Sequence, residues 1–491
     1  MTDIRDGQHR AFLQKIAKQV MANRGFLPEI PYQAIAELNR YLEKNPINGT
    51  AVRDLVHLPW CSIDNDASLD LDQLTVAEIV PGNKIKILVA VSDVALFVKR
   101  HSGIDDYAEH NTTSVYTGAK VFPMLPEKLS TDLSSLNYGA DRYALITEMV
   151  FDEQGLLNSS DLYTARVNNH AKLAYAVVGA WLAGNGPLPQ DIKAIGGLEE
   201  NLHIQSRMAQ QLKSLRHEQG ALSLETLEAN PVFEGNTLKT LEAVEKNRAT
   251  EIIEEFMIAA NSVAAQFLTL NKIPALRRIV RTPKRWERIV ELAKERGHLL
   301  PDRPDAKALN EFLTQAKSAD PSLFPDLSLS VIKLLGPGEY QVERPGSAVT
   351  GHFGLALSDY THATAPNRRF PDLVTQRLIK AALAGENTPY TIEELLKLAK
   401  HCTDKADDAK KVERQLIKSA AAMLLENRIG EQFNAMVTGA SGKGTWVRVA
   451  YPPVEGRLVS GYAGLDVGRR LRVQLVYTDV ERGFIDFASM T

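Results

Sequence analysis

The densest group of ionisable side chains in the sequence lies in a short acidic segment that runs from Cys61 to Gln73. Its aspartates stand at even-numbered positions, so in any extended stretch their side chains point to the same side. These aspartates are Asp64, Asp66, Asp70 and Asp72. Crowded carboxylates repel one another, and a divalent cation that bridges them removes the repulsion. An all-oxygen donor set of this kind favours Mg²⁺, Mn²⁺ or Ca²⁺ over zinc.

Three interpretations of the acidic segment compete. An EF-hand loop requires glycine at its sixth position and an acid at its twelfth, where this chain has Leu69 and Thr75. A solvated acidic loop without function is the second, although Trp60, Ile63 and Leu71 interleave with the acids and indicate a partly packed segment. The third is a metal site for phosphoryl chemistry, in which the cation polarises a phosphodiester and activates water.

The elements that must position this segment follow from hydrophobic periodicity. Residues 85–91 are nearly continuously apolar and β-branched, which predicts a sheet-core strand within a strand region at about 74–98. From about 170 to 430 helical periodicity dominates, with strong helices predicted at 251–270 and 406–429. Residues 1 to about 50 predict two short helices around a Pro-containing loop, which fits either half of a helix-turn-helix or a packing appendage.

The last sixty residues change character. Five short apolar runs are separated by Gly, Asp and Ser, at 433–437, 446–450, 454–459, 471–477 and 484–487. Five strands in so short a stretch predict a small barrel of the OB-fold kind, which commonly binds single-stranded oligonucleotides. An all-β dimerisation module is the alternative.

Composition limits the class of protein. The chain has 491 residues, of which 44% are hydrophobic and 24% charged, so it is neither a single small domain nor globally disordered. With 57 basic and 60 acidic residues the net charge is 57 − 60 = −3, so any basic surface must be local. The two cysteines form no disulfide framework, and no apolar run approaches the length of a membrane span. We therefore expect a soluble, cytoplasmic protein that does not contact membranes.

Five blocks in order resemble the RNB family, the ribonuclease II and ribonuclease R exoribonucleases. The acidic segment is similar to the family's metal motif, and the later blocks are residues 111–116, 121–130, 254–261 and 352–373. The resemblance runs from about residue 54 to 430, and the terminal barrel resembles the family's RNA-binding OB fold. It implies an α+β protein with an RNB-type mixed α/β catalytic domain at 53–430, a helical appendage at 1–52 and an OB-fold β-barrel at 431–491. Typical bacterial members carry tandem cold-shock barrels first, and fifty helical residues cannot hold them.

The activity that this resemblance implies is Mg²⁺-dependent, processive 3′→5′ hydrolysis of single-stranded RNA to nucleoside 5′-monophosphates, with Mn²⁺ as another suitable cation. Asp64, Asp70 and Asp72 match three of the four motif acids, and Asp72 matches the catalytically most sensitive one. The fourth is Gln73 here, which brings an amide oxygen but no charge, so we expect weaker metal binding. Asp66 is a candidate for the missing charge. A catalytically weakened or inactive RNA-binding regulator with the same fold is therefore the alternative function.

The resemblance also assigns groups that contact RNA. Arg368 matches the family arginine beside the scissile phosphate, where a guanidinium stabilises transition-state charge. Tyr116 matches the tyrosine that stacks on the 3′-terminal base, and Tyr175 resembles a residue that contacts the ribose. Arg277 stands where the family commonly has a second stacking aromatic, and an arginine plane also stacks on bases. Glu413 matches an acid on the family's late helix, although core packing for Tyr175 and a surface ion pair for Glu413 remain open.

A local excess of cations supports an RNA partner. Residues 272–288 hold seven cations and one acid, and the terminal barrel carries several arginines, including Arg448 and Arg470. In a chain that is neutral overall, such an excess favours a surface that follows phosphates, with a solvated helix face as the alternative.

Overall fold

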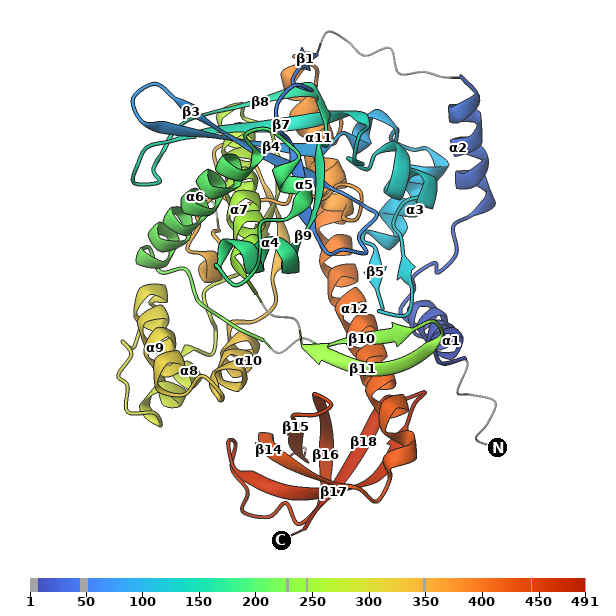
Figure 1. Cartoon of the computed structure of the whole chain (residues 1–491), viewed down its shortest axis with the longest axis vertical. Helices are drawn as coiled ribbons and strands as arrows, with labels where there is room; N and C mark the ends of the chain where they lie inside the picture. Colours follow the sequence, from blue (N-terminus) through green and yellow to red (C-terminus); the bar gives the residue numbers. More distant parts are fainter. Residues whose placement is uncertain are drawn as a thin grey trace.

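The computed structural model describes residues 8–44, 52–226, 229–243, 246–347, 350–442 and 444–490. A mixed α/β body lies at one end of the molecule and a small barrel at the other, and a long helix, α12, runs between them (Figure 1). The helices are α1 (His9–Asn23), α2 (Tyr32–Lys44), α3 (Gly103–Asn111), α4 (Tyr175–Leu182), α5 (Gln190–Lys193), α6 (Leu198–Glu218), α7 (Arg248–Leu270), α8 (Trp286–Lys294), α9 (Ala306–Ala319), α10 (Phe324–Leu335), α11 (Phe370–Leu383) and α12 (Ile392–Leu425).

A seven-stranded sheet of order β1-β8-β7-β4-β3-β2-β9 forms the centre of the α/β body. Its strands are β1 (Arg53–Asp54), β2 (Cys61–Asp64), β3 (Gln73–Val80), β4 (Lys84–Ser92), β7 (Asp141–Phe151), β8 (Leu157–Asn168) and β9 (Ala171–Ala174). β4 pairs antiparallel with β3 and β7, whereas β2 pairs parallel with β9. The strand region predicted near residues 74–98 is therefore confirmed as β3 and β4.

Both faces of β4 are buried, as its nearly continuous apolar sequence predicts. Ile87 and Val89 belong to the main core, which the sheet shares with α6, α7 and α11. Leu88 and Ala90 point to a smaller core on the opposite face, around Trp60. The central strands and the loops at their ends are thus fixed from two sides.

Two helix predictions are confirmed, one with a different start. α7 begins after Asn247, whose side chain accepts hydrogen bonds from the backbone N–H groups of Ala249 and Thr250. α12 starts fourteen residues before the predicted 406, because Thr391 and Glu394 form a capping box there. No helix among the described residues is long and apolar enough to cross a membrane.

The structure also contains pairings within the region predicted as predominantly helical. Two antiparallel ribbons are formed by β10 (Ala229–Glu234) with β11 (Thr237–Ala243), and by β12 (Ala275–Ile279) with β13 (Glu339–Glu343). A third short ribbon joins β5 (Val115–Tyr116) to β6 (Val121–Phe122). Both β10–β11 and β5–β6 contact α12, and α1 packs on the same helix (Figure 1).

The C-terminal residues form a closed five-stranded barrel of order β14-β15-β16-β18-β17, which confirms the predicted OB-type architecture. Each predicted apolar run lies within one of its strands: β14 (Gln432–Ser441), β15 (Gly444–Val449), β16 (Val454–Ser460), β17 (Arg470–Asp479) and β18 (Phe484–Ser489), with Ala450 just past the end of β15. Buried side chains of the barrel, α12 and α1 form one hydrophobic cluster. The barrel is therefore packed on the rest of the molecule through a shared core.

Candidate active site

The acidic segment connects β2 to β3. Asp64 is the last residue of β2, and its Oδ1 accepts hydrogen bonds from Asn65 N at 2.7 Å and Ser68 Oγ at 2.9 Å. Further along, Ser135 Oγ accepts from Leu71 N, which holds the end of the loop against the body. The segment is therefore a shaped loop between two paired strands, and the interpretation as a loosely solvated acidic run is wrong for its second half.

Asp72 is the most deeply buried of these carboxylates, with 2% of its surface exposed. Its Oδ2 accepts a 2.6 Å hydrogen bond from Arg368 Nε, whereas its Oδ1 is buried without a donor among the described residues. Burial raises the pKa of Asp72 to about 6, although the Arg368 charge acts in the opposite direction. A buried carboxylate oxygen with no donor is suited to coordinate a cation.

Asp70 lies beside Asp72 and is held by Tyr116. The Tyr116 hydroxyl donates to Asp70 Oδ2 at 2.8 Å, and the Tyr116 backbone N–H donates to Glu413 Oε1 at 3.1 Å. Burial raises the pKa of Tyr116, so its hydroxyl remains a donor at neutral pH. Tyr116 as a whole residue is 37% exposed, so it is only partly covered by the protein.

Arg368 reaches Asp72 from the loop before α11. Its backbone carbonyl accepts hydrogen bonds from Ser114 N and Thr113 Oγ1, which ties this loop to the segment that leads into β5. Burial lowers the pKa of Arg368, but the charge and hydrogen bond of Asp72, together with Tyr116 and Asp372, raise it above the ordinary value. The side chain as a whole is 41% exposed, so Arg368 is not fully covered by the protein.

Tyr175 begins α4 directly after β9, the strand that pairs with β2. Burial raises its pKa, and the charge of Asp64 adds to the rise, which places the Tyr175 hydroxyl near the acidic loop. The structure thus brings residues of five separate segments to one location: Asp64, Asp70, Asp72, Tyr116, Tyr175, Arg368 and Glu413.

Gln73 and Asp66 occupy contrasting positions. Gln73 opens β3 opposite Val91 and is buried, and its side-chain amide makes no hydrogen bond with the described residues. Asp66 is exposed in the loop, where its backbone carbonyl accepts from Lys172 Nζ at 3.2 Å. Asp66 thus lies away from the buried end of the loop at which Asp72 is fixed.

The donor set fits a hard divalent cation. No three Asp, Glu, His or Cys side chains in the described part of the chain are arranged as a ready-made metal site. However, the donors are all carboxylate oxygens, Asp72 Oδ1 lacks a donor, and the charge of Asp70 acts on both Asp64 and Asp72. Asp64, Asp70 and Asp72 would hold the ion.

Arg277 does not join the site. It lies on β12 with 2% of its surface exposed, forms an ion pair with Glu343, donates to Thr269 Oγ1 and lies 3.8 Å from Asp359. Its guanidinium plane is enclosed by protein, so the stacking role that the sequence suggested does not fit this placement. The sequence signal was ambiguous because it did not reveal the β12–β13 pairing that supplies Glu343.

Much of the predicted cationic wall is also used internally. Arg281 pairs with Glu339, Arg288 pairs with Glu291 at 3.3 Å, and Arg285 donates to a backbone carbonyl. On the barrel, Arg448 forms a bidentate ion pair with Asp326 of α10, with distances of 2.7 and 2.9 Å. Arg281, Arg285 and Arg448 thus connect different elements of the protein, whereas the Arg288–Glu291 pair lies within α8.

A polar network that the sequence analysis did not identify supports Arg368. The preceding residue, Asn367, is buried, and its Oδ1 accepts from Ser92 Oγ at 2.9 Å and from Ser134 Oγ at 3.1 Å. Ser92 N in turn donates to the Asp72 carbonyl. One buried amide thus links the arginine loop to the aspartate loop, and only its position next to Arg368 could have indicated this.

Comparison with known proteins identifies the family. The mixed α/β body with a closed terminal barrel defines the class: the RNB domain model matches residues 52–385, and the model of the RNase II-type exonuclease C-terminal S1 domain matches residues 431–489. Since the first match covers more than half of the chain, this protein belongs to the RNB family.

Individual relatives agree with this assignment. Ribonuclease R of Escherichia coli K12 is 33% identical over 443 residues, which cover 86% of this chain and 53% of that protein. This chain therefore spans about half the length of that relative. Ribonuclease R of Aquifex aeolicus is 28% identical, with 96% of this chain and 70% of that protein covered. A solved structure of Mycoplasma genitalium RNase R with ribose-methylated single-stranded RNA has a TM-score of 0.84 at 24% identity and covers 96% of this chain and 77% of that chain.

Proposed function

We propose that this protein is a 3′→5′ exoribonuclease that hydrolyses single-stranded RNA processively to nucleoside 5′-monophosphates with Mg²⁺ or Mn²⁺, in the cytoplasm. The observation that carries the proposal is the Asp72–Arg368 pair, in which a buried carboxylate keeps one oxygen without a donor beside a partly exposed arginine side chain. A bound divalent cation would supply polarisation of the phosphodiester and activation of water. Family membership supports the reaction class, and the solved complexes of M. genitalium RNase R with RNA support the ligand.

The chain's own residues have distinct tasks in this proposal. Asp64, Asp70 and Asp72 provide the oxygen ligands, and Arg368 pairs with phosphate oxygens and stabilises the charge that develops on them. Tyr116 stacks on a base of the 3′ end, which requires no particular base because each one has an aromatic face. Tyr175, next to Asp64, contacts the ribose, whose 2′-hydroxyl distinguishes RNA from DNA.

The test is hydrolysis of a 5′-labelled unpaired RNA. We expect a ladder that shortens from the 3′ end with Mg²⁺, no products with EDTA, and recovery when Mg²⁺ is restored in excess. Asp72→Asn removes the buried charge at almost constant volume and should leave the RNA intact. Asp106→Asn is the matched control on α3, where the same substitution affects an exposed side chain.

The second candidate is an RNA-binding protein that does not hydrolyse its ligand. Gln73 favours it, because this position contributes an amide instead of a fourth charge. If the unaltered protein binds unpaired RNA but releases no nucleotide with either Mg²⁺ or Mn²⁺, this candidate replaces the nuclease. If Gln73→Asp then gains hydrolysis, the missing charge is the cause.

A further inference from the structure

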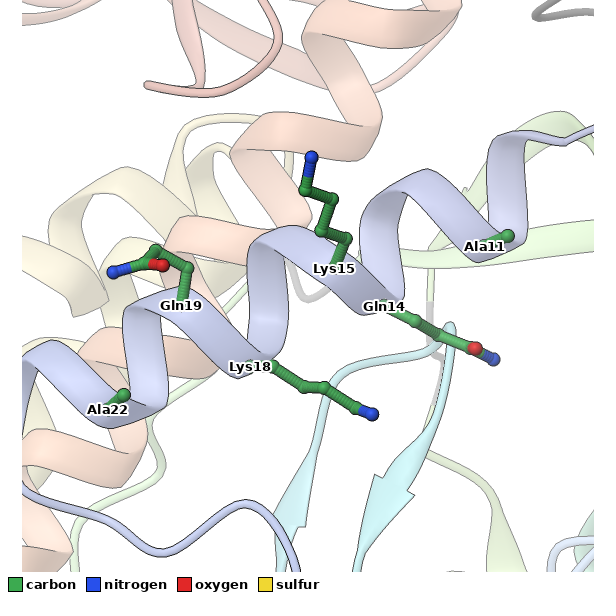
Figure 2. A pocket seen from close by; sticks show the side chains of 6 residues that line it. All are labelled: Ala11, Gln14, Lys15, Lys18, Gln19 and Ala22. Atoms are coloured by element: carbon green, nitrogen blue, oxygen red, sulfur yellow. The ribbon is translucent and has the colours of Figure 1, made fainter.

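The exposed side of α1 carries two lysines, Lys15 and Lys18, of which Lys18 pairs with Glu29 from outside the helix. In its fifteen residues, α1 contains Arg10, Lys15 and Lys18 and no aspartate or glutamate. A shallow pocket of about 420 Å³ lies along this exposed side (Figure 2). The side chains that line it recur at helical spacing and are small, amide-bearing or basic: Ala11, Gln14, Lys15, Lys18, Gln19 and Ala22.

The buried side of α1 and two of its polar side chains hold the helix on the rest of the molecule. Leu13, Ile16 and Met21 are buried in the cluster that α1 shares with α12 and the barrel. Gln14 Nε2 donates to the carbonyl of Ala119 at 3.2 Å, and Arg10 Nε donates to the carbonyl of Gly235 at 3.3 Å. α1 is therefore held against the turns of both short hairpins, β5–β6 and β10–β11.

The β5–β6 hairpin connects α1 to the acidic site. Its turn accepts from α1 at Ala119, and Tyr116, which directly precedes this turn, donates to Asp70. The exposed Lys120 stands in the same turn. Glu29 pairs with Lys18 at 2.5 Å, and its pKa is lowered first by the hydrogen bond from Lys18 and also by the charge of Lys120. The Lys18–Glu29 pair is neutral, and Lys15 and Lys120, which form no ion pair among the described residues, leave positive charge at α1 and the neighbouring turn.

We propose that the exposed side of α1 binds the phosphate backbone of the substrate RNA where it lies 5′ of the nucleotides in the acidic site. This inference rests on the proposed function, since it assumes that RNA occupies the site. The side chains lining the pocket are lysines and amides without an aromatic ring, which suits phosphate oxygens and gives no surface for stacking bases. The ligand is therefore an RNA strand that is bound through its phosphate charges, independently of its base sequence.

The test compares two lysine pairs of equal spacing. Lys15→Ala/Lys18→Ala removes the α1 cations, and Lys397→Ala/Lys400→Ala is the matched control on α12, where Lys400 also belongs to an ion pair, with Asp404. Both are made in the Asp72→Asn protein so that RNA is not consumed. Binding of a trinucleotide and of a long unpaired RNA is measured by fluorescence anisotropy over a series of salt concentrations.

We expect the α1 variant to bind the long RNA severalfold more weakly, while its affinity for the trinucleotide stays unchanged. Because each phosphate contact on a single strand contributes about 0.7 to the slope of log K against log salt, the loss of two contacts should reduce that slope by about 1.4. The control pair should change neither quantity.

The inference is overturned if the α1 variant matches the control in affinity and salt slope, or if it loses the trinucleotide as well. A parallel hydrolysis assay with unaltered Asp72 separates this result from the nuclease proposal. Degradation of RNA with no dependence on α1 would refute the inference alone. RNA that binds through α1 but is never hydrolysed would refute the nuclease alone.

Discussion

At the scale of single residues, two features of Asp72 shift its pKa in opposite directions. It is buried, which raises its pKa to about 6, and it is paired with a cation, which favours its ionised form. One oxygen is used by Arg368 and the other has no donor, so the carboxylate is only partly compensated. A further positive charge would complete it, and the neutral Gln73 that follows it in the chain adds no charge of its own.

Gln73→Asp should therefore strengthen cation binding. The added negative charge follows Asp72 directly in the chain, and we expect the Mg²⁺ dissociation constant to fall about tenfold, equivalent to about 1.4 kcal/mol. Isothermal titration calorimetry with Mg²⁺ measures the change. Gln73→Asn, which adds no charge, is the control, and equal dissociation constants for the two variants would contradict the prediction.

The contributions of the Tyr116 ring and of its hydroxyl can be measured separately. Tyr116→Ala removes the aromatic face and should weaken RNA binding by about 1–3 kcal/mol, the usual contribution of one stacked base. Tyr116→Phe keeps the face and loses only the hydrogen bond to Asp70, so RNA affinity should stay within a factor of about two. Anisotropy in the Asp72→Asn protein measures both. Equal losses for Ala and Phe would assign the role to the hydroxyl.

At the scale of elements, the sequence predicted those helices and strands whose apolar pattern lies within one continuous segment. α7, β4 and the barrel strands have a periodicity within one segment, and the structure confirms them. The β12–β13 ribbon joins residues about sixty positions apart, so no hydrophobic pattern within one segment predicts this pairing. That pairing brings Glu343 beside Arg277 and changes an apparent RNA contact into an internal ion pair. The prediction for Arg277 failed because a residue distant in the chain determines whether its side chain is buried.

Arg277→Ala should consequently destabilise the fold without changing RNA binding at the site. The substitution leaves Glu343 buried without its partner, and breaking a buried ion pair costs about 3–5 kcal/mol. Urea-induced unfolding measures the loss. Arg281→Ala, at a neighbouring pair that is far more exposed, is the control and should cost less than about 1 kcal/mol.

Affinity for a trinucleotide, measured where Arg277→Ala protein is still folded, tests the other half of this argument. It should equal that of the unaltered protein. A large loss of trinucleotide affinity with unchanged stability would restore the stacking role suggested by the sequence.

At the scale of the whole molecule, α12 and the shared core join parts that the sequence presents as separate. Most of the predicted site residues come together because β2, β5, β9, the loop before α11 and α12 meet at one place. The sequence showed a local excess of cations but did not show which groups these cations contact. Arg448 is an example, because it forms an ion pair with Asp326 and so connects the barrel to α10. The sequence thus predicted which types of residue form the site, whereas the contacts of each residue became known only from the folded structure.

The acid stability of the assembled fold depends in part on His352. Its Nδ1 accepts from Leu355 N, which requires the neutral ring, and burial together with the charge of Arg278 lowers its pKa to about 4. In the unfolded chain a histidine has a pKa near 6.5, so between pH 6.5 and 4 the unfolded state binds the additional proton. Stability from this group is therefore complete above pH 6.5 and falls as the pH decreases towards 4.

His352→Gln keeps a possible acceptor for Leu355 and removes the titration. The free energy of unfolding of the unaltered protein should fall relative to that of the variant by roughly 2 kcal/mol between pH 6.5 and pH 4. The comparison must be a difference, because Asp72, with its pKa raised to about 6, contributes in the opposite direction as it takes up a proton. Urea unfolding across this pH range measures both proteins. Parallel pH profiles would show that the His352 ring is protonated alike in the folded and unfolded chain, and would exclude it as a source of acid sensitivity.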